Sequence, residues 1–285
     1  MLHLPTAVWS LYAPSVRAIA VAVLVATAAH ARAAPTLGSH SAIVLQSGSR
    51  DELLATNADE IRPIASLTKL FVALVLRRHH LVLDSWSEIT AADAAVADGG
   101  AAPRLRRGES FRNIDLLHAM LLVSENRVPT ALARSVGLTP EQLVAELNAL
   151  AGELGLAHTK FIDPTGIAGN QSTARELAIA LDTALHDPLL ARIMRTKRAR
   201  FASRSDHQTI ELTSTVRPLW ERFRIRGGKT GHTDEAGYCM IVGADVAQRS
   251  VVMVFLGAPT SSARYGDFVR VAEWLARRLT GGPER

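Results

Sequence analysis

Three short polar motifs occur in order along the chain, and each carries residue types that can take part in acyl transfer. They are Ser66-Leu67-Thr68-Lys69, Ser124-Glu125-Asn126 and Lys229-Thr230-Gly231. A serine hydroxyl becomes a nucleophile only when a nearby base takes its proton. A buried lysine can be that base, because desolvation favours the neutral amine. Each motif alone is a weak signal, but the ordered set of three is specific, and it predicts a serine nucleophile served by a lysine.

Lysine is rare in this chain, which favours special roles for the lysines in these motifs. It occurs only at positions 69, 160, 197 and 229, and the other 28 of the 32 basic residues are Arg. Unlike Lys, Arg cannot give up its proton in a protein. Lys69 follows Ser66 by one helical turn, so the two side chains share a helix face. We expect Ser66 to attack, Lys69 to act as its base, and Lys229 to lower the pKa of Lys69 as a second cation.

The other two motifs supply groups that can bind and orient a peptide. Ser124 and Asn126 end the apolar run 116–123, where a hydroxyl can relay a proton and an amide can hold a peptide bond. The Lys229-Thr230-Gly231 motif lies on an expected strand, and the two glycines before it let a substrate backbone come close. An extended peptide can pair with the edge of such a strand, and Thr230 is suited to bind a carboxylate.

The elements expected to position these residues come from both ends of the chain. A hairpin is predicted at 42–45 and 52–55, and strands return at 209–215, 223–230, 237–244 and 250–257, before a terminal amphipathic helix at 262–279. The run from Ser66 to His80 is apolar on all sides, which is typical of a buried helix. From residue 113 to about 195 the periods are helical, with capping boxes beginning at Thr139 and Thr173.

This order predicts an α/β fold with an antiparallel sheet built from both ends of the chain, flanking helices and an inserted all-helical subdomain. We place the sheet domain at residues 34–84 and 209–285 and the helical subdomain at 85–208. The two parts are expected to form one catalytic unit, preceded by a targeting segment at 1–33.

The targeting segment has the three parts of a secretory signal peptide. Arg17 precedes an apolar run at 18–29, and small residues follow as Ala29-His30-Ala31 and Ala31-Arg32-Ala33. The apolar run is too short to anchor a protein across a bilayer. Cleavage after Ala33 would leave an exported protein, in the periplasm or cell wall, without a stable membrane anchor.

Composition excludes several other classes of protein. Of 285 residues, 48% are hydrophobic and 21% charged, which are globular values and exclude a disordered or fibrous chain. The single cysteine, Cys239, excludes a disulfide framework and a multi-cysteine metal site. The histidines show no metal-binding spacing, and we expect no metal and no cofactor. A basic stretch at 192–204 suggests nucleic-acid binding, but the signal peptide argues against a nucleic-acid partner.

The three motifs have the order found in the penicillin-recognising serine enzymes, and the chain resembles their low-molecular-mass D-alanyl-D-alanine carboxypeptidases and endopeptidases. The similarity also includes the segments around the motifs and Phe161-Ile162-Asp163-Pro164-Thr165-Gly166, and it extends from about residue 40 to 278. It implies a β-lactamase/transpeptidase-like fold and an activity on the peptide stems of peptidoglycan.

The resemblance also implies a role for each motif residue. Ser66 would attack the carbonyl of a D-Ala residue with Lys69 as base, and Ser124 and Lys229 would pass the proton to the leaving amine. The backbone N–H groups of Ser66 and His232 would form the oxyanion hole. Asn126 would hold the acyl-side amide, Thr230 and Gly231 would bind substrate, and β-lactams would acylate Ser66 as covalent inhibitors.

The branch within the family is inferred from what the chain does not contain. Carboxypeptidases of this kind commonly carry a further β-rich domain and a membrane anchor after the terminal helix, and the sequence has room for neither. This favours the shorter endopeptidase branch, which cuts the cross-link between D-Ala and a diamino acid. A D-alanyl-D-alanine carboxypeptidase is the alternative.

Two further alternatives are open from the residues. A class A β-lactamase needs a deacylating Glu in an E-x-x-L-N segment, and the nearest candidate, Val144-Ala145-Glu146-Leu147-Asn148, has Val in that place. A β-lactam-sensing module that acylates without turnover would keep the same motifs, and a turnover assay separates it from an enzyme.

Overall fold

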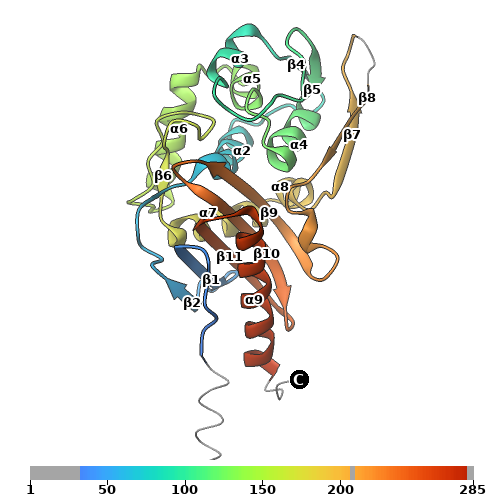
Figure 1. Ribbon diagram of the computed structural model, residues 1–285. Helices are drawn as coiled ribbons and strands as arrows, with labels where there is room; N and C mark the ends of the chain where they lie inside the picture. Colours follow the sequence, from blue (N-terminus) through green and yellow to red (C-terminus); the bar gives the residue numbers. More distant parts are fainter. Residues whose placement is uncertain (1–32, 206–208, 281–285) are drawn as a thin grey trace, which may run out of the picture.

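Strands from the two ends of the chain form one antiparallel sheet in the computed structural model, which describes residues 33–205 and 209–280. The strand order is β2 (Glu52–Thr56), β1 (Ser41–Gln46), β11 (Arg249–Ala258), β10 (Gly237–Val246) and β9 (Arg224–Thr233). The pairing of Ser41 with Leu256 and of Gln46 with Val251 joins the N-terminal hairpin to the C-terminal strands (Figure 1). The predicted sheet is therefore confirmed.

Both faces of this sheet are buried, which explains why its strands are apolar without a clear alternation. Ile43 and Leu45 of β1 pack into one hydrophobic cluster, whereas Ala42 and Val44 pack into another. Helix α9 (Ser261–Thr280) covers the second cluster, and α7 (Ala174–His186) packs on the opposite face (Figure 1). The sheet is a middle layer between helices, which leaves β9 as the edge strand beside the site.

Helix α2 (Thr68–Arg78) occupies the centre of the molecule and carries Lys69. Every residue from Thr68 to Leu76 is buried, and the helix packs against α4 (Asn113–Val123), α5 (Val128–Ser135), α6 (Pro140–Glu153) and α7. The buried helix is thus confirmed. Its first residues differ from the prediction, because a 3-10 turn at Ala65–Leu67, η1, precedes the α-helix and holds Ser66.

Helix ends follow the local signals in most places. Thr139 and Gln142 form the predicted capping box of α6. Thr173 accepts a hydrogen bond from the Glu176 backbone at the start of α7. The reciprocal half is missing, because the Glu176 carboxylate instead accepts bonds from His158 and Thr159. Asp187 caps α8 (Pro188–Met194), and Thr90 caps α3 (Ala91–Val96).

In the described part of the chain, three two-stranded sheets lie outside the central sheet. They are β3 (Arg62–Pro63) with β6 (Gln171–Ser172), β4 (Trp86–Glu88) with β5 (Ser110–Arg112), and β7 (Arg198–Ala202) with β8 (Thr209–Thr213). Only β8 was predicted, as part of the strand at 209–215, and it pairs with β7 instead of joining the central sheet. A second 3-10 turn, η2, follows at Arg217–Leu219. Part of the basic stretch at 192–204 forms β7, in which outward Arg side chains alternate with less exposed apolar ones.

The division into a sheet domain and a helical subdomain stays a prediction. Helix α7 falls within the proposed helical subdomain by sequence, yet it packs on the central sheet. The predicted signal peptide lies outside the described residues, except for Ala33. Within 33–205 and 209–280, no helix combines the length and apolar character that a membrane span needs.

Candidate active site

All three motifs meet at one cleft of about 520 Å³. The predicted residues that line it are Ser66, Ser124, Asn126, Thr230, Gly231 and His232. Lys69 and Lys229 are fully buried beside them. The structure therefore brings together every residue that the sequence nominated, although η1, the end of α4 and strand β9 are far apart in the chain.

The Lys69 amine lies within hydrogen-bond distance of three oxygen atoms. Its Nζ atom is 2.9 Å from Ser66 Oγ, 2.7 Å from Asn126 Oδ1 and 2.6 Å from the Thr165 carbonyl. Burial lowers the pKa of Lys69 to about 7, against the opposing charges of Asp163 and Glu125. A substantial fraction of this amine is therefore neutral near neutral pH.

The turn that holds Ser66 is pressed between two glycines. Ala65 is held at a φ of +47°, which is uncommon for a residue with a side chain. A Cβ on Gly231 would lie 3.1 Å from the Ser66 backbone nitrogen, and one on Gly166 would lie 2.0 Å from the Ala65 carbonyl oxygen. Both neighbours must be glycine for β9 and the 163–166 loop to come this close to the nucleophile.

Ser124 combines a left-handed backbone with a buried hydroxyl. It ends α4 in the left-handed region at φ +65°, and its buried Oγ has no hydrogen-bond partner among the described residues. An unpaired buried hydroxyl costs about 1–3 kcal/mol, and a left-handed serine adds to that. Such strain is concentrated at functional sites, and Ser124 lines the cleft.

Lys229 is buried on strand β9 and donates a hydrogen bond to the Thr230 carbonyl at 2.6 Å. Burial lowers its pKa well below the usual value, and the charges of Lys69 and Arg264 add to this effect. We expected the Lys229 charge to depress the pKa of Lys69. Burial is instead the main cause for both lysines, and the charge effect is found on Lys229.

The two glycines before the Lys229 motif face the protein interior and not the cleft. A Cβ on Gly227 would lie 2.9 Å from Met194 Cβ, and one on Gly228 would lie 2.7 Å from the Ile241 carbonyl. The expectation that they admit a substrate backbone is wrong, since they let β9 pack closely on α8 and β10. Of the three glycines 227, 228 and 231 on β9, Gly231 is the one that lines the cleft.

Residue-type reasoning missed the loop that follows Phe161. The Asp163 carboxylate accepts hydrogen bonds from the backbone of Thr165, Gly166 and Ala168, which fixes the loop. The loop in turn presents the Thr165 carbonyl to Lys69. The Asp-Pro-Thr-Gly sequence of this loop is typical of a turn, and that local pattern could have predicted the loop without the family resemblance.

Arg264 was also missed, because it lies on the terminal helix that was predicted only from its amphipathic pattern. Its side chain lines the cleft and is 7% exposed. The guanidinium donates to the carbonyls of Gly231 and Cys239, and it makes no ion pair with any carboxylate in the described part of the chain. It is a buried positive charge beside strand β9 at the cleft.

Thr230 and His232 are each held by a neighbour. Thr230 Oγ1 donates to Thr215 Oγ1 at 2.7 Å, and the His232 ring stacks on Tyr238 with centroids 4.0 Å apart. Among the described residues, no group of three or more His, Cys, Asp or Glu side chains could hold a metal ion.

Residues 27–260 match the family described as D-alanyl-D-alanine carboxypeptidase. This chain belongs to that family. The match covers most of the chain, including all three motifs. The predicted family, the enzyme class and the penicillin-binding character are thus confirmed.

Two curated relatives of this D,D-peptidase are named D-alanyl-D-alanine endopeptidase. The one from Pseudomonas aeruginosa is 32% identical over 241 residues, which are 84% of this chain and 77% of the relative. The one from Escherichia coli K12 is 27% identical over 256 residues, or 89% and 82% of the two chains. A D-alanyl-D-alanine carboxypeptidase from Bacillus subtilis, 26% identical, covers 82% of this chain and 61% of its own.

Solved structures show the same fold. The Streptomyces K15 DD-transpeptidase superposes with a TM-score of 0.79 over 85% of this chain and 98% of its own, at 24% identity. A D-alanyl-D-alanine carboxypeptidase from Mycobacterium tuberculosis gives a TM-score of 0.77 over 85% and 92%, at 26% identity. The predicted transpeptidase-like fold class is confirmed.

The family assignment gives the D,D-peptidase its general function. It is a serine D,D-peptidase acting on peptidoglycan peptides, in a family whose members work outside the cytoplasm at the cell wall and bind penicillins. The class A β-lactamase alternative gains no support, because residues 144–148 lie in α6 and none of them lines the cleft.

Proposed function

We propose that this enzyme is a D,D-endopeptidase that cleaves the cross-link between D-Ala and a diamino acid through an acyl intermediate on Ser66. The observation that carries the mechanism is the set of atoms around Lys69 Nζ. Asn126 Oδ1 and the Thr165 carbonyl can only accept hydrogen bonds, whereas the Ser66 hydroxyl can donate. A neutral amine has two N–H groups and one lone pair. Bonding to the two acceptors directs the lone pair at Ser66.

Acylation then begins with proton transfer from Ser66 to Lys69. The Ser66 oxygen attacks the D-Ala carbonyl carbon, and the negative charge that develops on the carbonyl oxygen is stabilised by backbone N–H groups. We assign this oxyanion hole to the Ser66 and His232 amides, which is supported by the close approach of Gly231 to the Ser66 nitrogen.

Collapse of this intermediate breaks the carbonyl carbon–nitrogen bond and releases an amine, which needs a proton. We assign to Ser124 and Lys229 the relay that passes the proton from Lys69 to this amine and so returns Lys69 to its neutral form. The Ser124 hydroxyl lines the cleft with no hydrogen-bond partner among the described residues, and both lysines are buried nearby. Water then hydrolyses the acyl-Ser66 ester, with Lys69 as the base again. β-Lactams would acylate the same Ser66 oxygen, forming an ester of the opened lactam that hydrolyses slowly.

Substrate binding is assigned to the two ends of the cleft. The Asn126 amide would hold the acyl-side peptide bond. Thr230 and Arg264 would bind a carboxylate on the carbon next to the scissile nitrogen, because Arg264 is a buried cation without a carboxylate partner among the described residues. We further propose export by the signal peptide at 1–33.

Two observations bear on the choice between endopeptidase and carboxypeptidase. The two relatives named endopeptidase align with most of this chain at 32% and 27% identity, which favours the endopeptidase. Terminal D-Ala also has a carboxylate next to the scissile nitrogen, so Thr230 and Arg264 equally fit a D-alanyl-D-alanine carboxypeptidase. This second activity is the alternative.

Purified mature protein assayed on cross-linked muropeptide dimers and on free pentapeptides decides between them. The endopeptidase releases monomers from dimers with a higher kcat/KM than it trims terminal D-Ala. Contacts to the bulky leaving group that form in the transition state raise kcat as well as lower KM. A kcat/KM that favours pentapeptide by tenfold or more would make the enzyme a carboxypeptidase, with the same residues in the same roles.

A further inference from the structure

A segment between α3 and Leu105 closes one side of the cleft. Gly99, Gly100 and Ala101 line it, and we call residues 97–103 the cleft wall. The wall lies directly on Asn126, because a Cβ on Gly100 would be 2.2 Å from Asn126 Nδ2. The same Cβ would be 2.8 Å from Ile167 Cδ1, which also lines the cleft. Any peptide bound to Asn126 therefore passes beside the wall.

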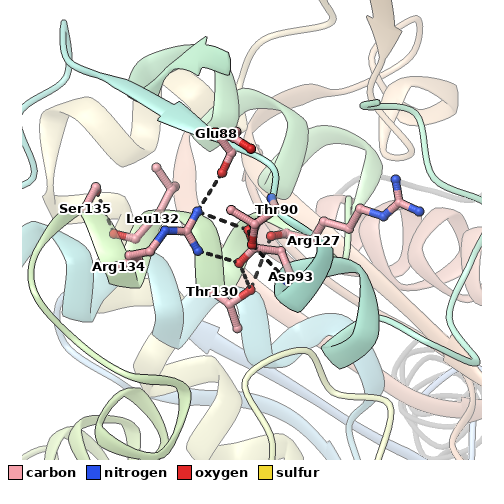
Figure 2. Close-up of polar contacts among 8 residues, drawn as sticks. All are labelled: Glu88, Thr90, Asp93, Arg127, Thr130, Leu132, Arg134 and Ser135. Carbon is pink, nitrogen blue, oxygen red and sulfur yellow. Dashed lines mark hydrogen bonds and ion pairs between the residues drawn. The ribbon is translucent and has the colours of Figure 1, made fainter. Parts of the chain in front are cut away.

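The first end of the wall is anchored by a buried carboxylate on α3. Asp93, 1% exposed, accepts hydrogen bonds from Thr130 Oγ1 at 2.6 Å and from Arg134 Nη1 at 2.9 Å, both on α5. It also accepts bonds from the backbone and hydroxyl of Thr90 (Figure 2). Arg134 in turn donates to the Glu88 carbonyl. Asp93 thus ties α3 and the strand before it to α5.

This carboxylate is ionised in the folded protein. Burial opposes its charge, but the hydrogen bonds from Arg134, Thr130 and Thr90 prevail and hold the pKa of Asp93 below its usual value. A buried charge with this many partners tolerates little displacement, because moving it away from any of them leaves a desolvated polar group.

The second end of the wall is anchored to the turn that carries Asn126. The Arg104 backbone N–H donates to Glu125 Oε2 at 2.6 Å, and Arg127 Nη1 donates to the Leu105 carbonyl at 2.9 Å. Both anchors thus end in the stretch 125–134, which includes Asn126 and α5. These bonds fix the wall relative to the turn that carries Asn126.

We propose that Asp93 is a positioning residue that, through Thr130 and Arg134, holds the cleft wall beside Asn126 so that Gly99, Gly100 and Ala101 contact the acyl-donor stem peptide. This inference rests on the proposed function, and specifically on Asn126 holding the acyl side of the substrate. The proposed ligand of the wall is the part of the stem peptide that precedes the reacting D-Ala. A substrate without this part makes no contact with the wall.

Two variants disturb the wall from different places. Asp93→Asn removes the negative charge that pairs with Arg134. It also puts an amide N–H group where the carboxylate accepts a hydrogen bond, so two donors then face each other. Gly100→Ala leaves Asp93 intact but forces the wall and Asn126 apart. The matched control is Gly152→Ala, a glycine-to-alanine change in α6 whose new Cβ meets no atom within 4 Å.

Each variant is assayed with the cross-linked muropeptide dimer and with aminopenicillanic acid, the penicillin nucleus without an acyl side chain. Rates are expressed per active site, titrated with a fluorescent penicillin. We expect kcat/KM on the dimer to fall about tenfold or more, mainly through KM, for both Asp93→Asn and Gly100→Ala. Acylation by aminopenicillanic acid should change less than twofold for Asp93→Asn, and Gly152→Ala should match the wild type on both. For Gly100→Ala the loss on the dimer should exceed the loss on aminopenicillanic acid, which is not zero because displacing Asn126 also disturbs its bond to Lys69.

Equal losses on the two probes, or no loss per active site together with a lower melting temperature, would overturn the proposal and leave Asp93 a purely structural residue. If Asp93→Asn does not fold, Gly100→Ala decides alone. Failure of aminopenicillanic acid to acylate Ser66 in the wild type would instead count against the proposed function.

Discussion

Lys69 has to be buried, desolvated and still surrounded by polar partners, and the structure meets all three demands. Its amine reaches Ser66, Asn126 and the Thr165 carbonyl, while carboxylates at Asp163 and Glu125 limit the loss of its charge. The result is a pKa of about 7, where the amine can take a proton from serine and still give one up. An arginine at this position could donate hydrogen bonds to the same acceptors, but it could not act as the base.

The two buried lysines should therefore differ in their tolerance of Arg. Lys69→Arg should acylate at least about 10²-fold more slowly than the wild type, nearly as slowly as Lys69→Ala, because Arg cannot accept the proton. Lys229→Arg should retain more activity, since Ser124 shares the proton delivery assigned to Lys229 and Arg can still donate to the Thr230 carbonyl. Acylation rates with a fluorescent penicillin measure both, and near-full activity in the two Arg variants would refute this division of roles.

The acylation rate should also report the pKa of Lys69 directly. Only the neutral amine is a base, so the rate should rise with pH and level off above about 7. The Glu125 carboxylate raises this pKa, and Glu125→Gln should therefore move the rising limb to lower pH. Glu153→Gln, on the exposed face of α6, is the control. A limb that stays in place or moves to higher pH contradicts the assignment of Lys69.

The same pKa has a consequence for stability. In the unfolded chain Lys69 titrates near 10.4, whereas in the folded protein it titrates at about 7. Between these values the unfolded state binds the proton and the folded state does not, so this group makes the free energy of unfolding rise with pH from about 7. The destabilisation is largest below pH 7, where both states are protonated.

At the scale of elements, the site depends on three backbones that pack against η1. Ala65 lies in the left-handed region, the 163–166 loop touches its carbonyl, and β9 passes close to the Ser66 nitrogen at Gly231. No side chain fits between them. The position of the nucleophile is thus set by close backbone packing as well as by the buried helix that follows it.

Comparing two glycines distinguishes the effect of this close packing from the effect of a left-handed backbone alone. Gly166 and Gly48 have φ values of +89° and +86°, but a Cβ on Gly48 meets nothing within 4 Å. Gly48→Ala should cost about 1–2 kcal/mol of unfolding free energy from the left-handed backbone alone. Gly166→Ala should cost more and should also slow penicillin acylation, because the Ala65 carbonyl must move. Equal costs, with normal acylation in both, would show that the contact does not matter.

At the scale of the whole molecule, the sequence predicted the sheet, the buried helix and every motif residue that meets in the cleft. These features depend on strong local patterns, such as apolar strands and an all-apolar helix. Three kinds of feature were missed. Strand β7 is short and Arg-rich, Arg264 is a charged residue on an amphipathic helix, and Gly227 and Gly228 face the interior. Each of these features depends on contacts between distant parts of the chain, which the local sequence pattern does not indicate.

The exported form of the chain is a separate prediction. The signal peptide predicted at 1–33 should be removed, so the protein recovered from the periplasm or medium should begin within a few residues of Ala34. Intact-mass measurement determines this. A mass that includes residues 1–33 would contradict the signal-peptide assignment.

The proposed mechanism depends most on the Ser66 oxygen being the attacking atom. Peptide mapping by mass spectrometry after treatment with benzylpenicillin should place one acyl adduct on Ser66 in the wild type and none in Ser66→Ala. Ser66→Ala should remain folded, since losing one hydroxyl at a helix start costs about 1 kcal/mol. An undiminished adduct in Ser66→Ala, or an adduct on any other residue of the wild type, would contradict the mechanism.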